Sequence, residues 1–230
     1  TEKIMARNSC RDSTSPGELV WADINSIMTM DYLGKSTFNL FDKLGAKELF
    51  NRDKVICVSD HLVPPPTEAF ANLLNEWRAE VKKHNVTYFY DFGKQGIAHQ
   101  IMVEDGHVLP GTISVGTDSH ANTYGALGAV GNAVSVTDAA VAMATGKLWF
   151  RVPETVKFHI PGEWQPWVMG KDLAMHIMNM MHWNGDLIYK ALEYSGPAID
   201  SLSMAGRITL CNMTVDLGAK NGIIAPDKKT

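Results

Sequence analysis

Three short apolar runs in this chain are continuous rather than alternating, and each stops at an aspartate. They cover residues 55–59, 86–90 and 112–117, and the aspartates are Asp60, Asp91 and Asp118. Continuous apolar runs are typical of parallel strands that are buried on both faces. Between the first two runs, apolar residues recur at helical spacing from Phe70 to Val81, after Thr67 as a helix cap. Strand, helix and strand in this order predict an α/β fold with a mainly parallel sheet covered on both faces.

Further elements follow from local signals. We expect a strand at 18–24, a helix at 37–44 that ends before Gly45, and a helix at 138–146 capped by Thr137. The small residues at 125–131 predict a loop or a closely packed helix. These elements form a first α/β domain, residues 1–152. A second α/β domain, residues 153–230, is expected to be incomplete, with a strand at 155–160 and helices at 172–181 and 211–219.

Composition narrows the class of protein. The chain is 45% hydrophobic and 20% charged, as in ordinary globular proteins, which excludes a disordered chain or a coiled coil. A net charge of −4 argues against nucleic acid as a partner. No apolar run approaches the ~18 residues of a membrane span, and the first residues lack the apolar core of a secretory signal. Three cysteines without short spacing indicate a reducing compartment, so we expect the cytoplasm or an organellar matrix.

Polar residues directly after two of the predicted strands form the candidate site. Asp60-His61 follows the first run and Asp118-Ser119-His120 follows the third. In open parallel sheets, ligands bind beyond the carboxyl ends of the strands, so the two groups are expected to face one crevice. His99, on a loop that contains glycine, is a third candidate. Such a set suits metal binding or proton transfer, whereas each pair alone is more often a turn or a cap.

Two specific motifs, one catalytic and one for nucleotide binding, are absent. The segment around Ser119 is not a G-x-S-x-G nucleophile elbow, and the glycines at 125, 128 and 131 do not form G-x-G-x-x-G. Asn212 and Asp216 are four residues apart and would share one helical face, a pair that most often faces solvent.

Ordered motifs along the chain resemble the aconitase superfamily, and most closely the large subunits of its 3-isopropylmalate dehydratases. The motifs are DHLVP at 60–64, GIAHQ at 96–100, VLPG at 108–111, GTDSH at 116–120, TYGALG at 123–128, ATGKLW at 144–149, VPET at 152–155, YKALEY at 189–194, GPAI at 196–199 and CNM at 211–213. The resemblance extends over essentially all 230 residues and implies aconitase-like three-layer α/β/α domains.

The resemblance implies a hydro-lyase that dehydrates and rehydrates a small hydroxy-dicarboxylic acid, of the 2-isopropylmalate to 3-isopropylmalate type. It implies a [4Fe–4S] cluster as Lewis acid, and a partner subunit with a swivelling domain that supplies the base. Asp60 and His61 would assist the leaving hydroxyl. The implied hydrogen-bonding shell and neighbours of the substrate or cluster are His99, Asp118, His120, Ser119, Asn212 and Asp216.

The chain departs from this pattern in three ways. Cys10, Cys57 and Cys211 do not occupy the positions of the family's cluster ligands, so no metal ligand is assigned in this chain. Asp216 stands where relatives carry Glu, and Met30-Asp31 stands where they carry His and an acidic residue. We interpret the chain as part of a hydro-lyase whose cluster ligands lie elsewhere, inactive alone. Two alternatives are a cluster-free hydratase with a single metal ion at His61, His99 and His120, and a non-catalytic scaffold.

Overall fold

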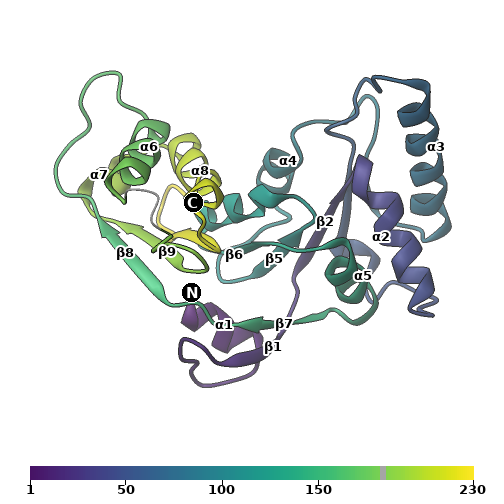
Figure 1. Ribbon diagram of the computed structural model, residues 1–230, viewed down its shortest axis with the longest axis horizontal. Coiled ribbons are helices and arrows are strands. Elements are labelled where there is room, and N and C mark those ends of the chain that lie inside the picture. Colours follow the sequence, from purple (N-terminus) through teal and green to yellow (C-terminus); the bar gives the residue numbers. More distant parts are fainter. Residues whose placement is uncertain (182–184) are drawn as a thin grey trace.

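The computed structural model describes residues 1–181 and 185–230, which fold into two lobes joined side by side (Figure 1). Each lobe is built around a parallel sheet. The helices are α1 Glu2–Asn8, α2 Asp31–Lys43, α3 Glu68–Lys83, α4 Ala98–Glu104, α5 Val136–Thr145, α6 Gly170–Met180, α7 Pro197–Ser201 and α8 Met204–Asn212, with 3-10 turns η1 Arg52–Lys54, η2 Ser119–Leu127 and η3 Val215–Leu217. The strands are β1 Leu19–Asp23, β2 Ser26–Met30, β3 Val55–Val58, β4 Tyr88–Tyr90, β5 Ile113–Gly116, β6 Val130–Ala133, β7 Lys147–Arg151, β8 Thr155–His159, β9 Ala191–Ser195 and β10 Asn221–Ile224.

The larger sheet has five parallel strands in the order β4-β3-β2-β5-β6, with helices on both faces. Successive residues of the central strand β2 enter different cores, because side chains alternate along a strand. Ile27 packs into a core formed with α2, α3 and α5. Met28 and Met30 pack into a second core formed with α4 and η2. The α/β class with a mainly parallel sheet, covered on both faces, is therefore confirmed.

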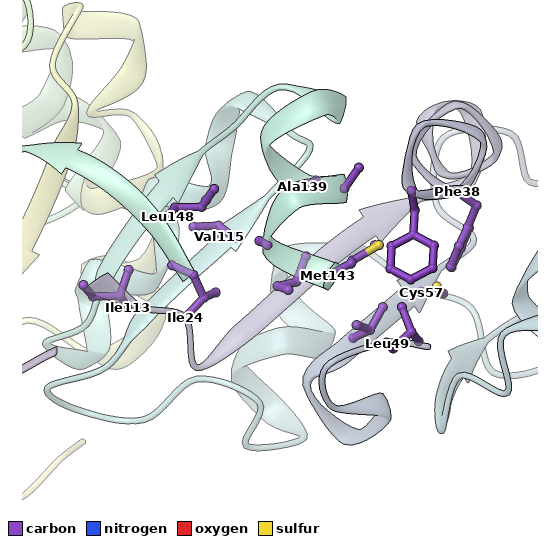
Figure 2. Close-up of a cluster of buried hydrophobic side chains, with 14 of the residues drawn as sticks. Ile24, Phe38, Leu49, Cys57, Ile113, Val115, Ala139, Met143 and Leu148 are labelled. Atoms are coloured by element: carbon purple, nitrogen blue, oxygen red, sulfur yellow. The ribbon is translucent and has the colours of Figure 1, made fainter. Parts of the chain in front are cut away.

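Figure 2 shows the first of these cores, between the sheet and α2 and α5. Phe38 comes from α2, Met143 from α5 and Val115 from β5, and all three are fully buried. Cys57 of β3 lies among these hydrophobic side chains and is also fully buried. This cysteine therefore serves as a packing residue of the core.

The second lobe contains a three-stranded parallel sheet in the order β10-β9-β8. A separate antiparallel ribbon pairs β1 with β7, so that Trp21 lies opposite Trp149. In sequence, the strands of the five-stranded sheet come before residue 152 and those of the three-stranded sheet come after it. However, Ala126 and Leu127 of η2 pack into the core of the second lobe. The division into domains 1–152 and 153–230 stays a prediction.

Most of the expected elements are present with small shifts of their ends. Thr67 caps α3 by accepting a hydrogen bond from the Phe70 N–H, and Leu74, Trp77 and Val81 are buried as the helical spacing predicts. The expected strand at 18–24 is β1, and Gly45 follows α2 with a φ of 78°. A side chain at this φ would be strained, so glycine suits the end of the helix.

Three expectations about helices are wrong. The cap of α5 is Ser135, whose hydroxyl accepts from the Asp138 N–H at 3.1 Å, rather than Thr137. The expected helix at 211–219 does not form, because α8 ends at Asn212 and a short 3-10 turn follows. α2 begins at Asp31, six residues earlier than expected, directly after the unpredicted strand β2.

The two lobes meet closely at Gly125 of η2. A Cβ atom at this position would overlap the carbonyl oxygen of Gly222 in β10. Backbone cannot move aside as a flexible side chain can, so only glycine fits here.

We predict that Gly125→Ala lowers the free energy of unfolding by about 3 kcal/mol or more, because overpacking forces the backbone apart. Urea unfolding followed by circular dichroism measures this change. Gly96→Ala is the control, since its Cβ would meet only the end of the flexible Ile101 side chain, at 3.3 Å. Equal stability of the Gly125→Ala variant and the native protein would contradict the close contact.

Candidate active site

The candidate site lies where β3, β2 and β5 end. These strands are neighbours, and their register places Met30 opposite Val58 and Met28 opposite Gly116. Since the strands are parallel, the residues that follow them emerge at one edge of the sheet. The sequence prediction that Asp60-His61 and Asp118 share this edge matches the observed arrangement.

Asp118 is the centre of the site, because three imidazoles face its carboxylate. His99 Nε2 donates to Asp118 Oδ1 at 2.6 Å, and the backbone N–H of His120 donates to the same oxygen at 2.8 Å. His61 Nε2 lies 3.7 Å from Oδ2, and His120 Nδ1 lies 3.6 Å from Oδ1. Burial alone would raise the pKa of Asp118, but the hydrogen bonds from His99 and His120 outweigh it and lower the pKa to about 2. The carboxylate is therefore ionised at neutral pH.

His99 is the most enclosed of the three imidazoles. It lies in the first turn of α4, not on a loop as expected from the glycine before it. Its Nδ1 is 3.4 Å from the hydroxyl of the buried Tyr124. With Asp118 bound to its other nitrogen, the ring is held on both sides and cannot turn freely.

His61 is the most accessible imidazole, with a side chain that is 42% exposed. Its Nδ1 lies 3.8 Å from Asp60 Oδ2, too far for a direct hydrogen bond. Asp60 Oδ2 instead accepts from the Ala98 N–H at 2.8 Å, which connects the end of β3 to the start of α4. The ring of Tyr32 lies 5.3 Å from the His61 ring, centre to centre.

His120 forms the opposite side of the site. Its Nδ1 is 3.0 Å from the Ser119 hydroxyl, and its Nε2 is 3.7 Å from Asp216 Oδ2. Asn212 donates to the Thr123 hydroxyl at 2.9 Å, and that hydroxyl donates to the backbone carbonyl of His120. Asn212 and Asp216 do not share a helical face, because α8 ends between them. They approach the site through separate contacts with η2 and its neighbours.

Asp31, known from the sequence only as part of a departure from the family's pattern, also lies at this edge. Its carboxylate is fully buried. Oδ2 accepts from the backbone N–H groups of Asp60 at 2.9 Å and Leu62 at 2.7 Å, and Oδ1 accepts from the Tyr32 N–H at 3.0 Å. Asp31 therefore fixes the turn that carries His61. The side chain of the preceding Met30 is apolar and buried in the core, so it offers no polar group to the site.

The cysteines do not fit an iron–sulfur cluster. Cys57 lies in the core of the first lobe and Cys211 in the core of the second, whereas Cys10 is exposed beyond α1. Burial raises the pKa of both buried thiols, which disfavours the thiolate that a cluster needs. Within residues 1–181 and 185–230, His61, His99 and His120 also do not form a group with metal-ligand spacing. The alternative with a single metal ion at these imidazoles gains no support from this arrangement.

The chain is similar to a well-defined family. A model described as the aconitase family (aconitate hydratase) matches residues 3–230. The chain is 41% identical over 229 residues to the 3-isopropylmalate dehydratase large subunit of Thermodesulfovibrio yellowstonii, and 44% identical over 229 residues to large subunit 1 from Pyrococcus abyssi. Each alignment takes in all of this chain and 54% of the relative. The chain therefore spans about half the length of the curated relatives it matches.

A solved structure supports the fold. The holo-form of aconitase X from Thermococcus kodakaraensis aligns with a TM-score of 0.51 at 10% sequence identity. The alignment covers 89% of this chain and 52% of that one. In the described part of the chain, no helix is both long and apolar enough to cross a membrane.

We predict that Asp31→Ala lowers the free energy of unfolding by about 3 kcal/mol, because it leaves the Asp60 and Leu62 N–H groups without an acceptor. Asp31→Asn keeps one carbonyl oxygen and should lose less. Urea unfolding of both variants measures the difference. If Asp31→Ala is as stable as the native protein, the turn does not depend on this carboxylate.

Because the pKa of Asp118 is low, we predict that the free energy of unfolding decreases as the pH is lowered. A carboxyl group whose pKa is lower in the folded than in the unfolded chain stabilises the fold above the unfolded value of 3.8, and this stabilisation is lost as the pH falls toward 2. Between about pH 5.5 and pH 3, the native protein should lose about 1 kcal/mol more than Asp118→Asn does. Urea unfolding at both pH values tests this, and parallel losses would show that Asp118 has an ordinary pKa.

Proposed function

The chain belongs to the aconitase family, and from this premise we propose that it forms part of a hydro-lyase for a small hydroxy-dicarboxylic acid. One observation carries the proposal: a single ionised carboxylate, Asp118, is surrounded by three imidazoles from different segments of the chain. Imidazoles near neutral pKa are the side chains best suited to give and take protons at physiological pH.

Elimination of water needs a proton for the departing hydroxyl group. His61 and His120 suit this role, because their side chains are 42% and 36% exposed and can reach a substrate in front of the sheet edge. Each ring lies near two carboxylates: Asp60 and Asp118 for His61, and Asp118 and Asp216 for His120. Both rings therefore lie where an imidazole can exchange a proton with a departing hydroxyl group.

His99 has a different role in this proposal. Because Asp118 and Tyr124 hold its two nitrogens, the ring acts as a positioning group that keeps Asp118 ionised and correctly oriented. Asp60 positions His61 indirectly, through its bond to the first turn of α4. Ser119, Asn212 and Asp216 complete the side of the site formed by η2.

We take the substrate and the partner of this proposal from the names of the relatives. Those described above are named 3-isopropylmalate dehydratase large subunits, which favours interconversion of 2-isopropylmalate and 3-isopropylmalate and implies a small subunit. We assign the base that removes the carbon-bound proton to that subunit. The thiols of this chain do not fit a [4Fe–4S] cluster, so we assign the ligands of the family's cluster to sequence beyond these 230 residues. None of the residue roles given above depends on this cluster.

We predict that His61→Ala lowers kcat by about 10²–10⁴-fold in the assembled enzyme, the usual loss for a group that transfers a proton. The enzyme is prepared anaerobically from the complete large subunit and the small subunit, and formation of the unsaturated diacid is followed by its ultraviolet absorbance. His159→Ala, an exposed histidine of β8, is the matched control and should keep the native kcat.

Two outcomes would contradict the proposal at different levels. An unchanged kcat in His61→Ala would remove His61 from proton transfer but leave the reaction assigned. No hydration or dehydration by the native, cluster-loaded assembly on any hydroxy-dicarboxylate of this class would contradict the function itself and favour a scaffold.

A further inference from the structure

We propose that Asp42, Glu80 and His84 form a binding site for a zinc-type divalent cation that joins α2 to α3. The site is separate from the candidate active site. Asp42 lies eleven residues beyond Asp31 on α2, about 16 Å along the helix at 1.5 Å per residue. In residues 1–181 and 185–230, no other group of three such side chains brings its ligand atoms within 4.8 Å of one another.

Two of the distances between ligand atoms match the edges of a zinc coordination tetrahedron, and all three atoms lie within 4.8 Å of one another. His84 Nε2 lies 3.3 Å from Asp42 Oδ1 and 3.5 Å from Glu80 Oε2. Zinc binds nitrogen and oxygen ligands at about 2.0–2.2 Å, so neighbouring corners of its tetrahedron are about 3.3–3.6 Å apart. Glu80 and His84 are four residues apart at the end of α3, which places both on the side that faces α2.

His84 provides a second, independent observation. Its side chain is only 5% exposed, and its ring packs against Phe38 and Phe41 with centres 5.1 Å away in each case. Among the described residues, Nε2 has no hydrogen-bond partner of suitable geometry, although two carboxylates lie close to it. A buried nitrogen without a partner is costly. A cation between Nε2 and the carboxylates would give this nitrogen the partner it lacks.

The chemistry of the donors selects the class of cation. His84 supplies a ring nitrogen and the two carboxylates supply oxygen atoms. One imidazole and two carboxylates, with a fourth position open to water, provide nitrogen and oxygen ligands that zinc accepts. Calcium and magnesium prefer six or more oxygen ligands. A polar cavity of about 650 Å³ lies beside His84, with Lys83 and Asn85 among its lining residues.

Lys83 competes for the same carboxylates. Its ammonium group contacts Asp42 Oδ2, and it lies 3.0 Å from Glu80 Oε2. Asp42 Oδ1, which faces His84, is the other oxygen of that carboxylate. Lys83 is half exposed, so its flexible side chain can move into solvent when a cation binds. Removing its charge should therefore strengthen cation binding.

The test is a zinc titration of the chelator-treated, dialysed protein against a chromophoric zinc indicator. We expect one equivalent of zinc to bind. Glu80→Gln should weaken binding by more than the ~10–100-fold that is lost when only an outer partner of a ligand is removed. Lys83→Met should tighten binding by about fivefold, the effect of one unit charge at ~4 Å in water. Glu76→Gln, one turn earlier on α3 and paired with Lys35, is the matched control and should bind zinc like the native protein.

The Glu80 side chain is 22% exposed and Glu80→Gln keeps its size, so this variant is expected to fold, and circular dichroism verifies this. As a second measurement, zinc should raise the Tm of the native protein and not that of Glu80→Gln. Three results would overturn the proposal: no stoichiometric zinc in the native protein, equal affinity in Glu80→Gln, or a bound zinc that is lost in His61→Asn instead. The last result would assign the metal to the candidate active site.

Discussion

The pairing of β2 between β3 and β5 is the constraint on which the rest of the molecule depends. It brings the ends of three strands to one edge, and the fully buried Asp31 then ties the turn after β3 to the end of β2. A buried carboxylate is tolerated only when its oxygens are bonded, and here three backbone N–H groups do this. The sheet and the site are thus connected by one side chain, and the position of His61 follows from the core.

The sequence predicted the elements whose signals are local and strong. The helical spacing from Phe70 to Val81 and the cap at Thr67 define α3, and the continuous apolar runs define β3 and β5. β2 was missed because its sequence, Ser-Ile-Met-Thr-Met, mixes polar residues with methionines that are common in helices. Its strand conformation comes from pairing on both sides, which is a property of the sheet and cannot be read from five residues.

For the candidate site, the sequence predicted that these side chains lie close together, but not how deeply each one is buried. Strand ends alone brought Asp60, His61 and Asp118 together. They could not indicate that His99 starts a helix and is enclosed, because that depends on how α4 packs against η2 and Tyr124. The contact of Asp216 with His120 has a similar origin. It arises from the turn after α8, which no periodicity reveals, and the shorter aspartate still lies 3.7 Å from the ring.

Accessibility separates the roles of the three imidazoles in the proposed function. Carboxylates lie close to the rings of His61 and His120, within 3.8 Å in each case. These two rings are also the accessible ones, so a substrate in front of the sheet edge meets them first. His99 is enclosed and bonded to Asp118, which leaves it to hold that carboxylate rather than to meet the substrate.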